Sequence, residues 1–257
     1  MTIAGALFAE PRIVDASACH FYHTMDIPEH GLVQGEWDLR GRERIYLGGV
    51  DLTSKSVLEI GTASGYLCYW MEEQGAQVTS LDLDRTAAWD LVAHHGADRG
   101  AQDRERYETL DRLNNAWWFT HAKRGSKARC IYRSIYQLGS DVGTFDVVTL
   151  CSVLLHLRDP IRAIELACAR SRSEIVITDV SERQFLGSKP ELQNELCLHF
   201  IPRADQKGAI DAWHYLPSAL VVEAVKIFGF ADVAVTQHTQ RFMDGHDWQF
   251  YTVVGRR

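Results

Sequence analysis

Two acidic residues flank a short glycine loop in the first third of the chain. Glu59 stands two residues before Gly61 in "SVLEIGTASGYL", and Asp82 follows Gly61 by twenty-one residues in "VTSLDLD". An acid at the end of the next strand accepts hydrogen bonds from both hydroxyls of a ribose. Gly61 allows a sharp turn after a strand, and Gly65 allows the backbone to approach a ligand at the start of a helix. These residues indicate a site for an adenosine-type cofactor.

The spacing of the glycines argues against a pyrophosphate ligand. A dinucleotide loop needs a glycine at or beside Ala63, which "GTASG" does not supply, and the sequence has no G-x-x-x-x-G-K-[ST] phosphate loop. Glu59 would repel a pyrophosphate, but it suits a ligand that carries an ammonium and a sulfonium group. The two acids and the loop therefore favour S-adenosylmethionine (SAM) over NAD. An ordinary glycine turn in an α/β domain is the alternative.

The elements that position these residues follow an α/β pattern. After Asp51, short β-branched runs alternate with helical segments, which is typical of a largely parallel sheet. The pattern predicts strands over 56–60, 77–81, 129–133, 146–150 and 174–179, a helix over 217–228, and strands over 232–237 and 249–255. Because no helix separates the last two strands, we expect them to pair antiparallel and to give the sheet one reversed edge strand.

The chain is expected to have a cap and a core. Residues 1–50 read as an N-terminal cap, and residues 51–257 as the core, with insertions at about 85–127 and 182–216. Cap and insertions are expected beside the carboxyl ends of the strands, where open α/β sheets bind ligands.

Composition and charge restrict the class of partner. The net charge is −7, and the one dense basic stretch, 99–112, is interrupted by acids, so a nucleic-acid partner is not expected. No apolar run approaches the ~20 residues that span a bilayer, and six scattered cysteines predict reduced thiols in a cytoplasmic protein. Adjacent His94 and His95 would point about 100° apart on a helix, so no metal site is expected with Asp98.

Several motifs resemble one known family. Residues 59–65 (EIGTASG), Asp82, "FDVV" at 145–148 and the antiparallel final strand resemble the class I SAM-dependent methyltransferases. The resemblance implies a Rossmann-like α/β sheet of seven strands with the last one antiparallel, here with an N-terminal helical cap and insertions. "FYHTMDIPEHGLVQGEWDLR", "SIYQL", "GTFDVV" and "LLHLRDP" resemble the branch that contains wobble-uridine tRNA carboxymethyl/methoxy methyltransferases and uncharacterised bacterial relatives. That tRNA branch typically has a tyrosine, which engages carboxy-SAM, where Leu155 stands, so ordinary SAM is favoured here.

The resemblance also assigns cofactor contacts by motif position. The methionine end and loop would involve Glu59, Gly61, Thr62, Ala63 and Gly65; the ribose, Asp82; the adenine, Leu83, Ser134 and Ile135; the region near the methyl group, Cys151 and Ser152. The product of the cofactor would be S-adenosylhomocysteine (SAH).

Candidate acceptor-side residues follow the fourth strand and fill the second insertion. His156 and His214 are candidate catalytic residues, with packing or backbone-bonded roles as the alternatives. Trp213 and Tyr215 are expected to line an acceptor pocket.

The cap offers four more candidates. Tyr22 and His23 are expected to close over the cofactor. Trp37 and Arg40 are expected to bracket its carboxylate, with an ion pair between cap and core as the equal alternative for Arg40.

These observations predict a SAM-dependent methyltransferase of a small molecule, in natural-product biosynthesis. The alternatives are a tRNA wobble-uridine methyltransferase and a SAM-binding module without catalysis. The acceptor atom (N, O or C) and the oligomeric state stay open.

Overall fold

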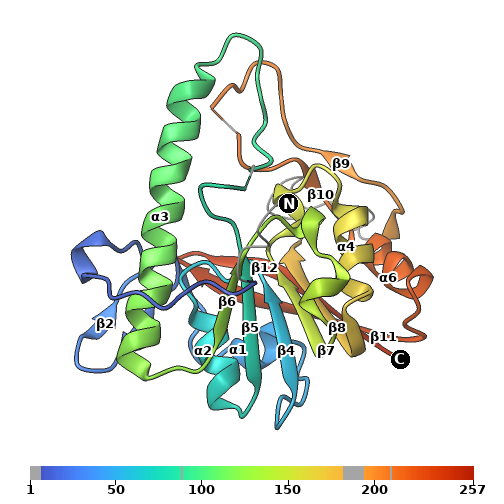
Figure 1. Cartoon of the computed structure of the whole chain (residues 1–257). Helices are drawn as coiled ribbons and strands as arrows, with labels where there is room; N and C mark the ends of the chain where they lie inside the picture. The colour runs from blue at the N-terminus through green and yellow to red at the C-terminus, as the bar shows by residue number, and fades with distance from the viewer. Residues whose placement is uncertain (1–6, 88, 182–193, 209) are drawn as a thin grey trace, which may run out of the picture.

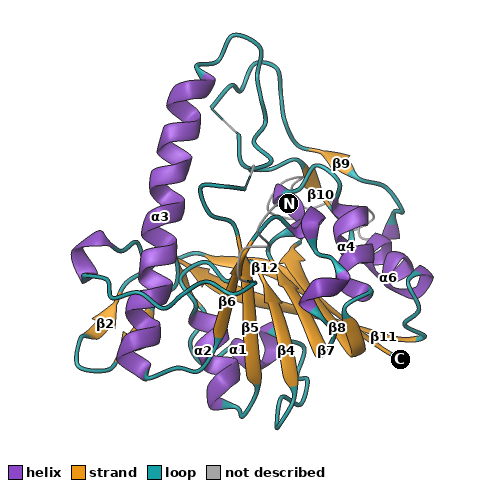
Figure 2. Ribbon diagram, in the orientation of Figure 1, coloured by secondary structure: helices purple, strands orange, loops and turns teal. Residues whose placement is uncertain are grey.

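A mixed eight-stranded sheet forms the centre of the molecule (Figures 1 and 2). The computed structural model describes residues 7–87, 89–181, 194–208 and 210–257. In sheet order the strands are β3 (Trp37–Asp38), β11 (Asp232–Phe242), β12 (Asp247–Arg256), β8 (Ser171–Val180), β7 (Phe145–Cys151), β4 (Ser56–Ile60), β5 (Gln77–Asp82) and β6 (Arg129–Tyr132). From β8 to β6 neighbouring strands are parallel, whereas β12 is antiparallel to both β8 and β11.

The sheet confirms the predicted α/β class with an antiparallel last strand and corrects two details. The reversed strand β12 is internal, because it pairs with β8 on one side and forms a long hairpin with β11 on the other. An eighth strand, β3, extends the sheet beyond the expected seven by pairing Trp37 with Phe242 of β11. A short strand supplied by the N-terminal segment has no periodicity long enough to reveal it in the sequence.

Helices cover both faces of the sheet. One hydrophobic cluster includes side chains of α1 (Glu43–Tyr46), α2 (Tyr66–Glu73) and α3 (Arg99–Arg124), and the other includes those of α4 (Pro160–Cys168) and α6 (Ser218–Ile227). The carboxylate of Asp98 caps α3 by accepting from Ala101 N, and the helix ends at Gly125 in the left-handed region. This 26-residue helix accounts for most of the first predicted insertion.

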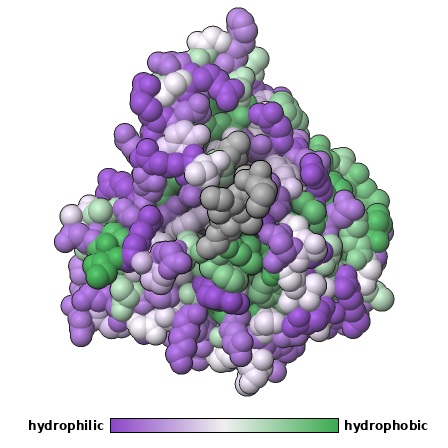
Figure 3. All heavy atoms as spheres, viewed as in Figure 1, coloured by the Kyte–Doolittle hydropathy of each residue, from purple (hydrophilic) through white to green (hydrophobic). Residues whose placement is uncertain are grey.

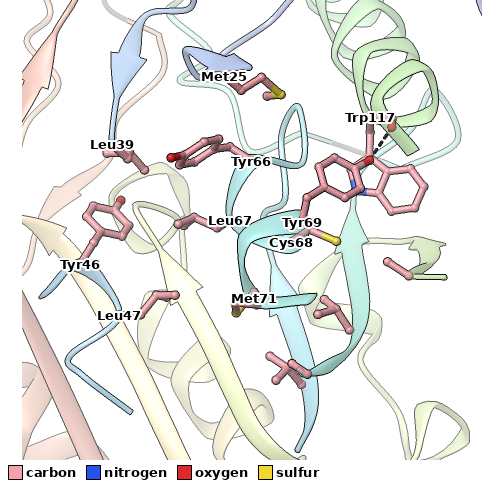
Figure 4. Packing of buried hydrophobic residues seen from close by; sticks show 14 of the residues in the cluster. Met25, Leu39, Tyr46, Leu47, Tyr66, Leu67, Cys68, Tyr69, Met71 and Trp117 are labelled. Atoms are coloured by element: carbon pink, nitrogen blue, oxygen red, sulfur yellow. Dashed lines mark hydrogen bonds between the residues drawn. The ribbon is translucent and has the colours of Figure 1, made fainter. Parts of the chain in front are cut away.

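The N-terminal cap is built mainly from strands and loops, so the expectation of a helical cap was wrong. Its elements in the described part are η1 (Ala16–Ala18), β1 (Met25–Ile27), β2 (Gly31–Val33), β3 and the four-residue α1. Met25 and Ile27 are buried and Asp26 is exposed, which is the alternation of a strand with one buried face. Figure 4 shows Met25 and Leu39 of the cap packed beside Tyr66 and other side chains of α2, so cap and core share one hydrophobic cluster.

Four short elements lie near the carboxyl ends of the strands, and one does not. Three single turns, η2 (Ile135–Gln137), η3 (Ser140–Val142) and η4 (Leu154–His156), flank β7 along the chain, and β9 (His199–Phe200) pairs with β10 (His214–Tyr215). The exception is η3, which precedes β7 and so lies at the amino end of that strand. In contrast, η2 follows the carboxyl end of β6, and η4 follows that of β7. The first residues of the second predicted insertion, 182–193, lie outside the described part. The loop before α3 runs beside the segment that leads to β10 (Figure 1), where Val92 N donates to Ile210 O at 3.0 Å.

The surface is mostly hydrophilic on the face shown in Figure 3. Hydrophobic residues gather at the right, where α6 lies, and at the left near β2. Large exposed hydrophobic side chains on these elements are Ile227 (76% exposed) and Leu32 (52%). In the described segments, no helix has the length and apolar character needed to cross a membrane. All six cysteines lie in these segments and are free.

Candidate cofactor and acceptor site

The glycine loop leaves β4 at the carboxyl edge of the sheet and begins α2. Gly61 has φ +83° and Gly65, the N-cap of α2, has φ +89°. A Cβ on Gly61 would lie 2.4 Å from Cγ2 of Val153, and one on Gly65 would lie 2.6 Å from Cε2 of Tyr69. Both positions therefore require glycine for conformation and for packing. The close approach at Gly65 is to Tyr69 and to Trp117 of α3, which Figure 4 shows side by side.

Asp82 lies against this loop at the end of β5. Its Oδ2 accepts from Ala63 N at 2.8 Å, and its Oδ1 accepts from Leu83 N at 2.7 Å. Loss of solvent raises the pKa of the carboxyl group, while the backbone donors oppose that rise. A carboxylate oxygen can accept more than one hydrogen bond, so Asp82 can hold the loop and still accept from ribose hydroxyls.

Glu59 is a buried residue of β4 that contacts the neighbouring strand β5. It is 3% exposed, and its Oε2 accepts from Ser80 Oγ at 2.8 Å. Burial raises the pKa of Glu59 to about 7. An ammonium group nearby would favour its ionised form.

Strand β6 brings two more predicted residues close to Asp82. Arg133 N donates to Asp82 O at 2.9 Å, so Ser134 and Ile135, which follow it, start η2 beside the end of β5. On the far side, the Leu83 carbonyl accepts from Asn114 of α3 at 3.1 Å. The structure thus brings together the three residues predicted to flank the adenine. Asn114 was missed because a polar residue in a long amphipathic helix gives no distinctive signal.

The cap is bonded directly to the glycine loop. Backbone N–H groups of Tyr22 and His23 donate to Ser64 Oγ at 3.1 and 3.2 Å, and Trp37 Nε1 donates to Tyr22 OH at 3.1 Å. Burial lowers the pKa of His23 to about 3, so its ring is neutral. The predicted lid residues therefore do lie at the loop.

Arg40 is held elsewhere. Its guanidinium bonds Asp38 at 2.8 Å and Asp26 at 3.4 Å, and it lines a surface pocket of about 570 Å³ with residues such as Trp70. Both partners belong to the cap, so the structure shows neither the expected carboxylate bracket at Arg40 nor the alternative ion pair between cap and core.

The end of β7 is conformationally strained. Ser152 has φ +55°, its N–H donates to Thr178 O at 2.7 Å, and its hydroxyl lies 3.0 Å from the Tyr46 hydroxyl. A non-glycine residue in this region costs about 1–3 kcal/mol and occurs often at functional sites. Cys151, which precedes it, is half-buried, and burial raises the pKa of its thiol. Tyr46 is a further site residue that the sequence did not indicate.

His156 is fixed in one tautomer. Its Nδ1 lies 2.6 Å from the Asp211 carbonyl oxygen, and because a carbonyl only accepts, Nδ1 carries the proton. Burial is the main cause that lowers the pKa of His156. The ring is therefore mainly neutral at pH 7, and its Nε2 carries the lone pair that can take a proton.

The β9–β10 segment packs on the turn that carries His156. Trp213 N donates to Leu155 O at 2.8 Å, and the guanidinium of Arg158 lies 4.7 Å from the centre of the Trp213 ring. His214 Nδ1 lies 3.4 Å from Leu157 O, and Tyr215 is 1% exposed. The structure brings the predicted acceptor-side residues together, with Tyr215 in the core of the segment.

Asp179 was missed by the sequence analysis. It is 2% exposed near the end of β8, its Oδ1 accepts from Val180 N at 2.8 Å, and the backbone N–H groups of Val180 and Leu155 both favour its ionised form. Burial raises the pKa of Asp179 to about 7. The signal that singled out Asp82, an acid closing a buried strand, is also present in "VITDV".

Comparison with known proteins decides the family. A family model described as a methyltransferase domain matches residues 34–235. This chain belongs to the methyltransferase-domain family. Together with the fold of the sheet, the match makes the protein a class I SAM-dependent methyltransferase.

Curated relatives match about half of this methyltransferase. A ubiquinone biosynthesis O-methyltransferase of Alkalilimnicola ehrlichii is 27% identical over 124 residues, 48% of this chain and 39% of the relative. One of Xanthomonas oryzae pv. oryzae is 29% identical over 121 residues, 47% of this chain and 40% of the relative. The match thus spans about two-fifths of the length of these relatives.

Solved structures share the fold. The N-terminal domain of EvdMO1, crystallised in the presence of SAH and D-fucose, has a TM-score of 0.53 at 16% identity and covers 91% of this methyltransferase and 89% of that chain. Magnesium protoporphyrin IX methyltransferase of Synechocystis PCC 6803 with bound SAH has a TM-score of 0.52 at 13% identity, with 83% and 80% covered. None of these proteins is named as a tRNA-modifying enzyme, so the resemblance to that branch stays a prediction.

Proposed function

We propose that this methyltransferase transfers the methyl group of SAM to a hydroxyl group of a small-molecule acceptor held between η4 and the β9–β10 segment. The observation that carries the proposal is the fixed tautomer of His156, whose Nδ1–H is bound by the Asp211 carbonyl. A neutral imidazole with a free Nε2 is a general base. An amine that is already neutral needs no such base, whereas a hydroxyl group must lose its proton.

The residues at the glycine loop fit the cofactor. Asp82 would accept from the ribose hydroxyls, with Leu83 and Ser134 beside the adenine, and Glu59 would favour the ammonium end from behind the loop. The buried carboxylates and the absence of pyrophosphate spacing in "GTASG" suit a cationic ligand without phosphate. When bound, SAM supplies an electrophilic methyl group on a sulfonium sulfur.

The other residues would orient the acceptor and exclude water. His156 would take the hydroxyl proton at Nε2 as the oxygen attacks, and the Trp213 ring with Arg158 would form one wall of the acceptor site. The backbone bonds from Tyr22 and His23 to Ser64 keep the cap over the loop. Methyl transfer is an in-line displacement, so alignment and water exclusion account for much of its acceleration.

Two further observations support a small acceptor. The curated relatives named above are ubiquinone biosynthesis O-methyltransferases, although the match covers about two-fifths of their length. The net charge is −7, whereas a protein that binds tRNA needs a basic surface to contact the phosphates.

The proposal is tested by transfer of a labelled methyl group. Wild type and His156→Gln are incubated with methyl-labelled SAM and with matched phenols, sugars and amines, and separately with bulk tRNA. We expect label on a hydroxyl compound, and a rate for His156→Gln lower by about 10²- to 10⁴-fold. His246→Gln, a change at an exposed histidine of the β11–β12 turn, serves as the matched control and should keep the wild-type rate. Label on tRNA, or an unchanged rate in His156→Gln, would contradict the proposal.

A further inference from the structure

Three side chains of different metal-ligating types meet just before and at the start of β9. Cys197 Sγ lies 3.2 Å from Glu195 Oε2 and 3.2 Å from His199 Nε2. The same Nε2 lies 3.5 Å from the same Oε2, so each of the three ligand atoms contacts the other two. The side chains come at alternate positions, and the chain bends at Cys197 before β9 begins at His199.

The distances fit a coordination tetrahedron. Ligand atoms about 2.0–2.3 Å from a zinc ion in tetrahedral geometry lie about 3.3–3.6 Å from one another. The three measured separations, 3.2, 3.2 and 3.5 Å, fall within a few tenths of an ångström of this range. A small outward shift of the side chains is therefore enough to admit an ion.

We propose that Glu195, Cys197 and His199 bind a divalent cation of the zinc class. A thiolate and an imidazole are the ligands that zinc and similar soft or borderline ions prefer, whereas magnesium and calcium select sets made of oxygen. Binding would release the thiol proton of Cys197 to solvent, and the three protein ligands would leave a fourth position for water. This proposal differs from the expectation of no metal. The three ligands lack the C-x-x-C or H-x-x-x-H spacing of familiar motifs, so the sequence did not reveal them.

The position of the cluster suggests what the ion does. His199 is paired with Tyr215 in the β9–β10 ladder, and the two rings stack with centroids 5.6 Å apart. Tyr215 follows Trp213 and His214, which lie on the acceptor side of the site. An ion on His199 would therefore tie residues 195–199 to the segment that carries the acceptor wall. A ladder of two residue pairs gains most from such a link.

Metal binding is tested on the full-length chain with cobalt(II) and zinc(II) alone. We expect one cobalt ion per chain, with the charge-transfer absorption of a cobalt–thiolate bond, and displacement of cobalt by zinc. Cys197→Ser should abolish that absorption, and His199→Ala should weaken cobalt binding by about 100-fold. His246→Ala is the matched control: His246 Nδ1 lies 3.3 Å from Asp244 Oδ2 without a sulfur ligand, so its loss should change nothing.

A second readout uses the reactivity of the thiol. Cys197 is the one cysteine of the six that is exposed, so a thiol reagent applied to the native protein reports mainly on it. Zinc should slow its modification in wild type but not in His199→Ala. Absence of the charge-transfer band, or equal protection in wild type and His199→Ala, would overturn the proposal, and SAH binding measured alongside would confirm that each variant is folded.

Discussion

Asp179→Asn should gain stability relative to wild type as the pH rises. The carboxyl group is 2% exposed, and burial raises its pKa from 3.8 to about 7. A group whose pKa is raised by folding stabilises the native state at low pH, and that stability is lost as the pH rises through the folded pKa. Wild type should therefore lose stability between about pH 4 and pH 7, and an uncharged asparagine of nearly the same shape should not.

The magnitude follows from the two pKa values. With 1.36 kcal/mol per pKa unit, the raised pKa of Asp179 lowers the free energy of unfolding by about 4 kcal/mol at pH 8 and about 2 kcal/mol at pH 5, relative to a group that does not titrate. The stability of Asp179→Asn relative to wild type should therefore rise by about 2–3 kcal/mol between these pH values. Any change in packing or in the hydrogen bond from Val180 N is the same at both pH values and cancels in this difference.

Urea unfolding at pH 5, 6, 7 and 8 measures the effect, with SAM and SAH absent. Asp146→Asn is the control, because the Ser56 backbone N–H, the Ser56 hydroxyl and the Arg172 guanidinium lower the pKa of Asp146 to about 2. Asp146 is fully ionised above pH 5 in both states, so its variant should differ from wild type by the same amount throughout. A difference for Asp179→Asn that stays constant from pH 5 to pH 8 would refute the reasoning.

Three further predictions address the loop, the base and the cofactor. Gly65→Ala should lower the free energy of unfolding by at least about 1–3 kcal/mol in a urea titration, because it adds a positive-φ residue and a clash with Tyr69; Gly41→Ala, which has a positive φ but open space, should cost less. The kcat/KM of wild type should be level above about pH 7, because burial keeps the pKa of His156 below 6.5, and a continued rise with pH would point to another base. Asp82→Asn should weaken SAH binding by about 10- to 100-fold in calorimetry, and unchanged affinity would remove Asp82 from the site.

Much of the sheet is predictable from local patterns. The strand at 56–60 and the helix at 217–228 have strong β-branched or amphipathic runs, and the structure confirms them within a residue or two. The position of β12 inside the sheet is not predictable in this way, because it depends on which of the two hairpin strands, β11 or β12, pairs with β8. The same holds for β3, whose two residues gain their pairing from the edge of β11.

The candidate site divides along a similar line. The sequence can place Asp82 and Ser134 at one edge of the sheet, because Asp82 closes β5, Ser134 follows β6, and parallel strands end at a common edge. Tyr46 reaches Ser152 only through the folding of the cap, and the tautomer of His156 depends on a carbonyl 55 residues away. Contacts between segments far apart in the chain produce no characteristic residue spacing by which the sequence could predict them. Asp179 is different, because its position near the end of a buried strand is visible in the sequence.

A crystal structure of the protein with SAH bound tests the central claim most directly. The account predicts ribose oxygens within about 2.5–3.2 Å of the Asp82 carboxylate, and the sulfur directed past Ser152 toward Nε2 of His156. SAH bound away from the glycine loop, or with its sulfur facing away from His156, would contradict it.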